Sequence, residues 1–173
     1  MSMKSLLSAF LFLSCLTSNA QNDRIHGDFD GDGNIEYAYM TYPDVEEDFE
    51  NIDFNDLVTV IHFSKESIPP IEIGCCVGGL LQNLGDLNND GRDEIGLWRG
   101  WIASCWHEYL SWRFDGDNWI PLLEPLTIHC DLWDEYGADF KPIQRIDDQR
   151  VKVYYNEWDN DEIATKSKVL RLK

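Results

Sequence analysis

Short segments with alternating apolar and polar residues recur along this chain, and the alternation predicts β-strands. Successive side chains of a strand point to opposite faces of a sheet, so a strand with one buried face has a period of two. The predicted strands are Ile35–Tyr42, Leu57–Phe63, Ile71–Ile73, Glu94–Trp98, Trp106–Phe114, Trp119–Leu123, Val151–Tyr155 and Ala164–Leu172. No segment keeps a helical spacing of apolar residues over several turns. The pattern therefore predicts an all-β protein.

Polar connections separate these strands and predict hairpins. Asp115-Gly116-Asp117-Asn118 lies between two strands, and Asp-Gly is a frequent hairpin turn. We expect a last hairpin linked by Trp158–Glu162, an exposed acidic loop over Asp44–Asp56, a buried strand over Leu57–Phe63 and a crossing segment over Gly74–Gly79. These connections favour antiparallel strands.

Two stretches of the chain are near-copies of each other. Gly27–Met40 reads GDFDGDGNIEYAYM and Gly85–Trp98 reads GDLNNDGRDEIGLW, and each runs from a polar loop into an apolar strand. The repeat divides a single domain, residues 21–173, into units at about 24–74 and 82–126, followed by a C-terminal hairpin unit at about 143–173. We expect a small antiparallel domain of two or three blade-like units, arranged as part of a propeller or as a sandwich.

The polar loops of these near-copies, residues 28–36 (the first loop) and 86–94 (the second loop), place oxygen-bearing side chains at alternate positions. The first loop offers Asp28, Asp30, Asp32 and Glu36, and the backbone carbonyl of Asn34. The second loop offers Asp86, Asn88, Asp90 and Glu94. Gly33 and Gly91 let the chain turn tightly around an ion. Calcium takes several oxygen ligands, whereas zinc and copper prefer the Cys and His that both loops lack.

The spacing of these loops differs from an EF-hand and resembles another calcium loop. An EF-hand needs a bidentate Glu at position 12, where this chain has Tyr39 and Leu97. The nine-residue pattern before a strand resembles the FG-GAP/VCBS repeats of integrin-α-like β-propellers, in two copies. The resemblance implies calcium at the edge of a blade, and it adds the backbone carbonyl of Arg92 to the second ligand set. Because Arg92 reduces the negative charge there, we expect the second site to be the weaker one.

The first 20 residues have the pattern of a signal peptide. Lys4 precedes the apolar stretch Leu6–Leu16, which is too short to span a bilayer, and Ser18-Asn19-Ala20 suits cleavage. A lipid anchor at Cys15 is an alternative, but Phe12-Leu13-Ser14 matches poorly the sequence that usually precedes a lipidated cysteine. We therefore expect a secreted or periplasmic protein. No later stretch is long and apolar enough for a transmembrane helix.

The chain is strongly acidic, which argues against one class of partner. Its 32 Asp and Glu residues outnumber its 14 Lys and Arg residues, and the formal net charge is −18. Such a surface disfavours binding to nucleic acids and anionic lipids. Bound cations would relieve the self-repulsion of the chain, which agrees with the calcium interpretation.

Four cysteines follow the expected signal peptide: Cys75, Cys76, Cys105 and Cys130. An even number in an exported protein favours two disulfides. Because a bridge between adjacent cysteines is strained, we expect Cys75–Cys105 with Cys76–Cys130, or Cys75–Cys130 with Cys76–Cys105. The rival interpretation is a zinc site built from Cys105, His107, His129 and Cys130, but the paired spacing of structural zinc sites is missing.

Tryptophan is concentrated around the second loop. Five of the seven tryptophans lie close together in the sequence: Trp98, Trp101, Trp106, Trp112 and Trp119. Large aromatic residues supply much of the core of a small β-domain, and we expect this role for most of them. Trp98 and Trp101 are the candidates for a platform that binds a sugar ring or a protein side chain. Trp101 follows a strand and is expected to be the more exposed.

These features predict an exported calcium-binding β-domain that serves as a binding module for a protein or a glycan. We favour a non-enzymatic role, because the chain has no Gly-x-Ser-x-Gly motif and no phosphate-binding glycine loop. An exported hydrolase that acts on a polymer, with structural calcium, is one alternative. An accessory subunit of an envelope complex is another.

Overall fold

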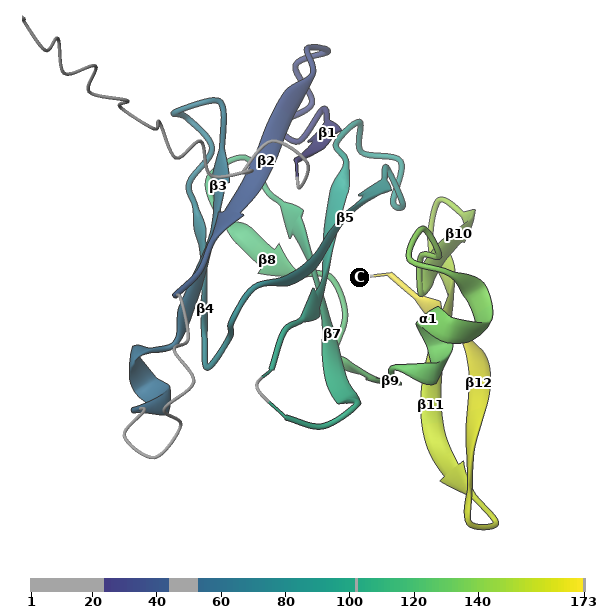
Figure 1. Cartoon of the computed structure of the whole chain (residues 1–173). Coiled ribbons are helices and arrows are strands. Elements are labelled where there is room, and N and C mark those ends of the chain that lie inside the picture. The colour runs from purple at the N-terminus through teal and green to yellow at the C-terminus, as the bar shows by residue number, and fades with distance from the viewer. Residues whose placement is uncertain (1–23, 44–52, 102, 173) are drawn as a thin grey trace, which may run out of the picture.

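The computed structural model describes residues 24–43, 53–101 and 103–172 and confirms that the protein is all-β. The described part contains three antiparallel sheets, the short helix α1 (Asp131–Tyr136) and a 3-10 helix at Phe54–Asp56. Figure 1 shows the sheets one beside the next, in the order of the chain. The predicted signal peptide lies outside the described residues, as do residues 44–52 of the predicted acidic loop.

The first sheet has the strand order β1-β2-β3-β4. Its strands are β1 (Ile25–Gly27), β2 (Glu36–Thr41), β3 (Val58–Phe63) and β4 (Ile71–Gly74). The sequence predicts a buried strand at β3, but only Thr59 and Ile61 are fully inside. The prediction was too broad because one face of this sheet packs against the rest of the protein while the other faces outward.

The second sheet is built on β7 (Trp106–Phe114), whose bounds are those predicted. Its other strands are β5 (Gly79–Gly85), β6 (Glu94–Arg99), β8 (Trp119–Pro121) and β9 (Leu126–His129). β6 and then β5 follow on one side of β7, while β8 and β9 pair with opposite ends of its other side. β5 was not predicted from the sequence, because Gln82 and Asn83 interrupt its apolar pattern.

The third sheet contains β10 (Ile143–Asp147), β11 (Arg150–Asp159) and β12 (Glu162–Arg171). The predicted C-terminal hairpin is present, but its strands are longer than predicted. Only Asn160 and Asp161 link them, with φ angles of 52° and 66°, and this left-handed backbone is typical of a two-residue hairpin turn. Trp158 therefore belongs to a strand and not to a connection.

Two hydrophobic cores lie on the two faces of the second sheet. Ile95 and Leu97 of β6 join the core with residues of the first sheet, including Ile61 and Ile71. Tyr109 of β7 joins the other core, which contains residues of the third sheet and α1. Because both faces of the second sheet are covered, β6 is buried at four consecutive positions, Glu94 to Leu97.

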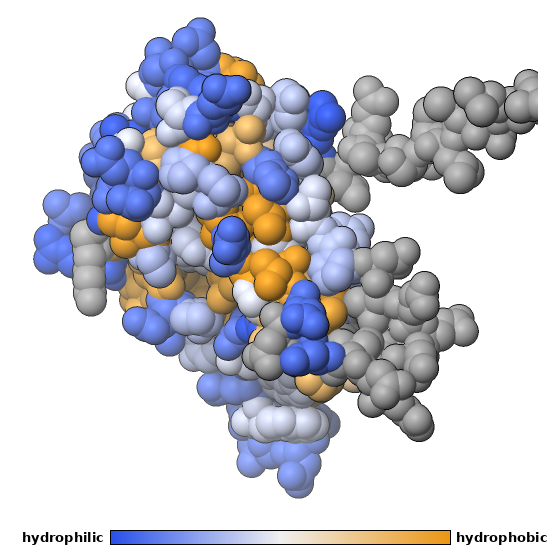
Figure 2. Space-filling view, turned by 90° about the vertical axis from the view of Figure 1, so that its left-hand side faces the viewer, coloured by the Kyte–Doolittle hydropathy of each residue, from blue (hydrophilic) through white to orange (hydrophobic). Residues whose placement is uncertain are grey.

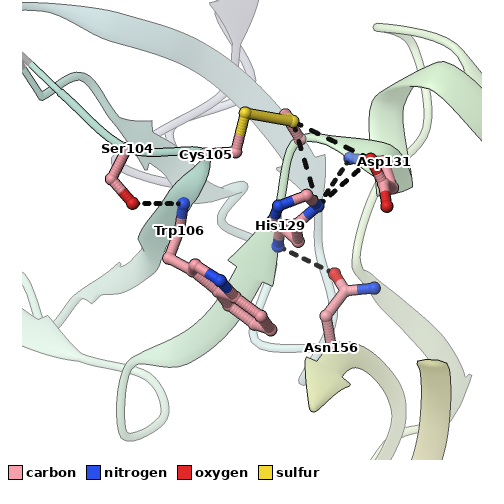
Figure 3. The surroundings of a disulfide bond; sticks show 7 residues. Ser104, Cys105, Trp106, His129, Asp131 and Asn156 are labelled. Atoms are coloured by element: carbon pink, nitrogen blue, oxygen red, sulfur yellow. Dashed lines mark hydrogen bonds and ion pairs between the residues drawn. A yellow bond between two sulfur atoms is a disulfide. The ribbon is translucent and has the colours of Figure 1, made fainter. Parts of the chain in front are cut away.

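The disulfide pattern differs from both predicted pairings. Cys105 is bonded to Cys130, with their Cα atoms 5.0 Å apart, while Cys75 and Cys76 are free. Trp106 of β7 pairs with His129 of β9, so the residues just outside this pair meet (Figure 3). Cys76 instead points into the first core, where its thiol donates to the carbonyl of Gly78 at 3.2 Å. Strand pairing, which the cysteine spacing does not reveal, decides the connectivity.

The outward side of the first sheet is shown in Figure 2, where hydrophobic residues are interspersed among hydrophilic ones. Ile35 and Tyr42, at the two ends of β2, are among the exposed hydrophobic residues of the protein. Within the described ranges, no helix has the length and apolar character needed to cross a membrane.

Candidate metal centre

The first loop connects β1 to β2 and is organised by the carboxylate of Asp28. This carboxylate accepts backbone N–H groups from Gly31 at 2.8 Å, Asp32 at 3.1 Å and Gly33 at 2.9 Å. Asp32 in turn accepts the N–H of Asn34 at 2.8 Å. These bonds curl the backbone so that Asp28, Asp30 and Asp32 offer oxygens within 4.8 Å of one another.

The second loop connects β5 to β6 and repeats most of these hydrogen bonds. Asp86 accepts the N–H groups of Asp90 at 3.1 Å and Gly91 at 3.0 Å. Asp90 accepts the N–H of Arg92 at 3.0 Å, as Asp32 does for Asn34. The two loops therefore have equivalent backbone shapes at equivalent positions, and the middle ligand position holds Asn88 in place of Asp30.

A buried glutamate closes each loop at its ninth position. Glu36 accepts the N–H of Phe29 at 3.1 Å, and Glu94 accepts the N–H of Leu87 at 2.6 Å. In both cases the donor belongs to the apolar second residue of the loop, which is part of a core. Burial raises the pKa of Glu36, and it raises the pKa of Glu94 to about 8. Neither carboxylate is a solvated surface group.

Glu94 has one oxygen that the protein leaves unsatisfied. Its side chain is fully buried, and Oε1 has no hydrogen-bond partner among the described residues. The negative charges of Asp90 and Asp86 add to the effect of burial on its pKa, so the carboxyl lies within electrostatic reach of the other candidate ligands. A buried polar atom without a partner is costly, and a bound cation would remove this cost.

A lysine from another part of the first sheet occupies the mouth of the first loop. Lys65 follows β3, and its ammonium group forms ion pairs with both Asp30 and Asp32. Hydrogen bonds to these two aspartates raise the pKa of Lys65 above its usual range. The ammonium thus stands where the carboxylates converge, which is where a metal ion would have to bind.

The two loops lie side by side although 58 residues separate them. The backbone N–H of Asp93 donates to the carbonyl of Asp28 at 2.8 Å, and the carboxylate of Asp93 accepts the N–H of Asp28 at 3.2 Å. The guanidinium of Arg92 donates to the carbonyl of Asp30 at 3.1 Å. Arg92 therefore reaches across to the first loop, and a change in one loop can be transmitted to the other.

The two predicted platform tryptophans have different surroundings. Trp98 lies between His107, with ring centroids 4.7 Å apart, and Trp133, with ring centroids 5.3 Å apart. Trp101 is 37% exposed and stacks on Phe54 with ring centroids 5.7 Å apart. Trp98 thus packs beside the second core, whereas Trp101 has a face open to solvent.

The rival Cys/His site is only partly assembled. Cys105, His129 and Cys130 lie within 4.8 Å of one another, but the disulfide occupies both sulfur atoms (Figure 3). His107, the fourth predicted member, instead uses Nδ1 in a 2.9 Å hydrogen bond with the carbonyl of Arg99. The disulfide explains the proximity of these residues without a metal ion.

Lys65 and Asp93 belong to this centre but were not predicted from the sequence. Lys65 has no local motif, because it reaches the first loop only after β2 and β3 have paired. Asp93 precedes a predicted ligand, and its sequence position gives no sign that it bonds to the opposite loop. No protein-family model, curated protein or solved structure matches this chain.

Proposed function

We propose that this protein is an exported β-domain whose first and second loops each bind one calcium ion, and that it serves as a non-enzymatic binding module. The observation that carries the calcium proposal is the buried carboxylate of Glu94. An ionised buried oxygen without a partner is unfavourable, and a cation held by Asp86, Asn88 and Asp90 beside it would supply the missing interaction.

The ligand chemistry favours calcium over other cations. Every candidate ligand in the two loops is a carboxylate, an amide or a backbone carbonyl, and hard cations prefer such oxygens. Magnesium demands near-ideal octahedral geometry and retains several waters, whereas calcium accepts a flexible set of protein oxygens. The resemblance to FG-GAP/VCBS loops agrees with calcium on the same residues. Export agrees with the signal-like residues 1–20 and with a disulfide, which persists in oxidising compartments.

The role proposed for calcium is structural. Ion binding would neutralise the carboxylates of adjacent loops and hold β1, β2, β5 and β6 at a fixed angle where the first and second sheets meet. This effect suits a domain with a formal charge of −18, because bound cations reduce the repulsion within its folded state. A rigid domain of this kind presents its remaining surface to a partner.

The test is a thermal unfolding measurement on the oxidised protein, in calcium and in EDTA at constant ionic strength. Ligand binding to the native state raises stability by about 2.7 kcal/mol per site at a calcium concentration 100 times Kd. We expect Asp28→Ala and Asp86→Ala each to lose part of the increase. Asp117→Ala removes an exposed carboxylate from the β7–β8 turn and serves as the charge-matched control. We expect this variant to keep the full calcium-dependent increase in stability. An unchanged wild-type melt, or an equal loss in the control, would contradict the proposal.

A further inference from the structure

An aromatic groove runs across β9, on a part of the surface that contains neither loop. It consists of two open hollows, of about 370 and 530 Å³, which share Trp106 and Thr127. Trp101 lines the first hollow, and Trp158 lines the second. Because the hollows share two of their lining residues, they lie next to each other, and together they suit an extended ligand.

The groove is lined by indole rings that are held in place. Trp106 lies against His129, with ring centroids 4.9 Å apart, and against Trp158, with ring centroids 5.9 Å apart. Trp158 is 65% exposed although it belongs to a strand, and such exposure is unusual for so large an apolar side chain. Flat, exposed aromatic faces in fixed positions stack on the C–H faces of other rings.

The charged residues of the groove are balanced. Arg99 and Glu108 in the first hollow form an ion pair at 2.6 Å, and the second hollow contains Glu157 and Lys168. The groove is therefore close to neutral on a chain whose formal charge is −18. A polyanion would be repelled by the molecule as a whole, and a polycation would find stronger attraction elsewhere on its surface. An apolar peptide would bury these charged groups away from water without offering them polar contacts.

We propose that the groove binds an uncharged oligosaccharide that extends across β9 from Trp101 to Trp158. Sugar rings present C–H faces to the indoles, and their hydroxyls donate to Glu108 and Glu157 and accept from Lys168. The hydroxyl of Thr127, at the point where the hollows meet, offers one more polar contact. The inference rests on the proposed binding role and names its ligand class.

The groove and the calcium loops are separate sites. The second loop ends where β6 begins, and Trp101 follows the other end of β6, so the six residues of this strand place them roughly 15–20 Å apart. No lining residue of the groove belongs to either loop. Sugar binding and calcium binding can therefore be tested independently.

The experiment screens the oxidised, calcium-loaded protein against immobilised fragments of glucans, xylans, mannans and chitin. Charged polysaccharides and a set of apolar peptides are included as competing ligand classes. The best uncharged ligand is then titrated by tryptophan fluorescence against wild type, Trp158→Ala and Trp106→Phe. Tyr136→Ala is the matched control, because Tyr136 is an exposed aromatic residue that does not line the groove. Thermal melts verify that each variant is folded.

The expected result is binding of at least one uncharged oligosaccharide, weakened about tenfold or more by Trp158→Ala and Trp106→Phe and unchanged by Tyr136→Ala. The inference is overturned if no uncharged ligand binds at millimolar concentration, if binding survives both groove variants, or if only charged polymers or peptides bind. The calcium melt of the same samples separates the two proposals. If calcium stabilises the protein but no sugar binds, only the proposal for the groove is rejected. If a sugar binds but calcium does not stabilise the protein, only the proposal for the loops is rejected.

Discussion

Glu94 is the residue on which the calcium proposal chiefly depends. It lies at the start of β6, inside the protein, with one oxygen bonded to Leu87 and the other unpartnered. Its pKa of about 8 lies above the reference value of 4.5, so the folded protein keeps a proton that the unfolded chain has lost. In the metal-free protein, the contribution of Glu94 to stability therefore falls as the pH rises from about 4.5 to about 8 and levels off above that range.

We expect Glu94→Gln to have opposite effects on stability with and without calcium. In EDTA at pH 9, the neutral amide avoids the buried charge, and we expect the variant to be more stable than wild type by on the order of 3 kcal/mol. In calcium, the loss of a ligand charge should reduce the calcium-dependent increase in stability. Urea unfolding over a series of pH values measures both effects. If the variant is less stable than wild type in EDTA at pH 9, the buried charge of Glu94 does not destabilise the metal-free protein, which would contradict the prediction.

Lys65 is the second residue with a specific consequence. A calcium ion could use Asp30 and Asp32 only after the Lys65 ammonium had left them, so under our proposal Lys65 competes with calcium at the first loop. We therefore expect Lys65→Met to strengthen calcium binding at the first loop by about tenfold, which corresponds to about 1.4 kcal/mol.

Calorimetric titration in an Asp86→Ala background isolates the first loop for this measurement. Lys166→Met is the matched control, because it removes the same charge from an ion pair with Asp159 on the third sheet. A similar gain in both lysine variants would mean that net charge, and not the contact with the first loop, controls affinity.

At the scale of elements, the Cys105–Cys130 disulfide connects the segment before β7 to the junction of β9 and α1. It closes a sequence separation of 25 residues and lies next to the Trp106–His129 strand pair. Cross-links of this length restrict the unfolded chain, and their removal typically costs about 3–4 kcal/mol. Because Trp101 and Trp106 flank Cys105, the same bond restrains the aromatic groove.

We expect the double variant Cys105→Ala/Cys130→Ala to lose about 3 kcal/mol of unfolding free energy relative to the oxidised wild type. A thiol reductant should lower the wild-type melting temperature and leave that of the double variant unchanged. Cys75→Ser provides the control, because this cysteine is free and only partly buried. If the reductant lowers the melting temperature of the double variant as much as that of wild type, the stabilisation does not come from the Cys105–Cys130 disulfide.

The elements also show where pattern reading succeeds and where it fails. β7 has the predicted bounds because Trp106–Phe114 alternates strongly and ends at an Asp-Gly turn. β5 was missed because its polar Gln82 is buried, with its amide donating to the carbonyls of Ala138 and Phe140. α1 was missed because its six residues are too few for a helical period to be recognised. Whether a polar side chain is buried, and whether a short element forms, depends on tertiary contacts. The periodicity of the sequence carries no information about these contacts.

At the scale of the molecule, the formal charge of −18 makes folding sensitive to ions in general. Self-repulsion destabilises the compact state, and salt screens it with a Debye length of about 10 Å at 0.1 M. We therefore expect the melting temperature in EDTA to rise by a few degrees between 10 and 300 mM NaCl. Micromolar calcium should add a further increase at constant ionic strength. If NaCl reproduces the whole calcium effect, general screening and not site binding would explain the stabilisation.

The sequence by itself determined the features that depend on local chemistry. Alternating apolar positions predicted the all-β class, because a sheet buries every second side chain regardless of its neighbours. The Asp, Asn and Gly spacing predicted two equivalent loops, because their shape is made by hydrogen bonds between residues at most five positions apart, as from Gly33 to Asp28 and from Gly91 to Asp86. The Asp115-Gly116 turn was likewise a local signal.

Only the tertiary structure decided which distant residues these local features contact. It paired Cys105 with Cys130, because the register of β7 and β9 brings them together and buries Cys76 elsewhere. It placed Lys65 on the first loop, set the two loops side by side, and joined Trp106 to Trp158 across β9 and β11. Each of these contacts joins residues distant in the sequence, and their proximity comes from strand pairing and core packing, which no local pattern encodes.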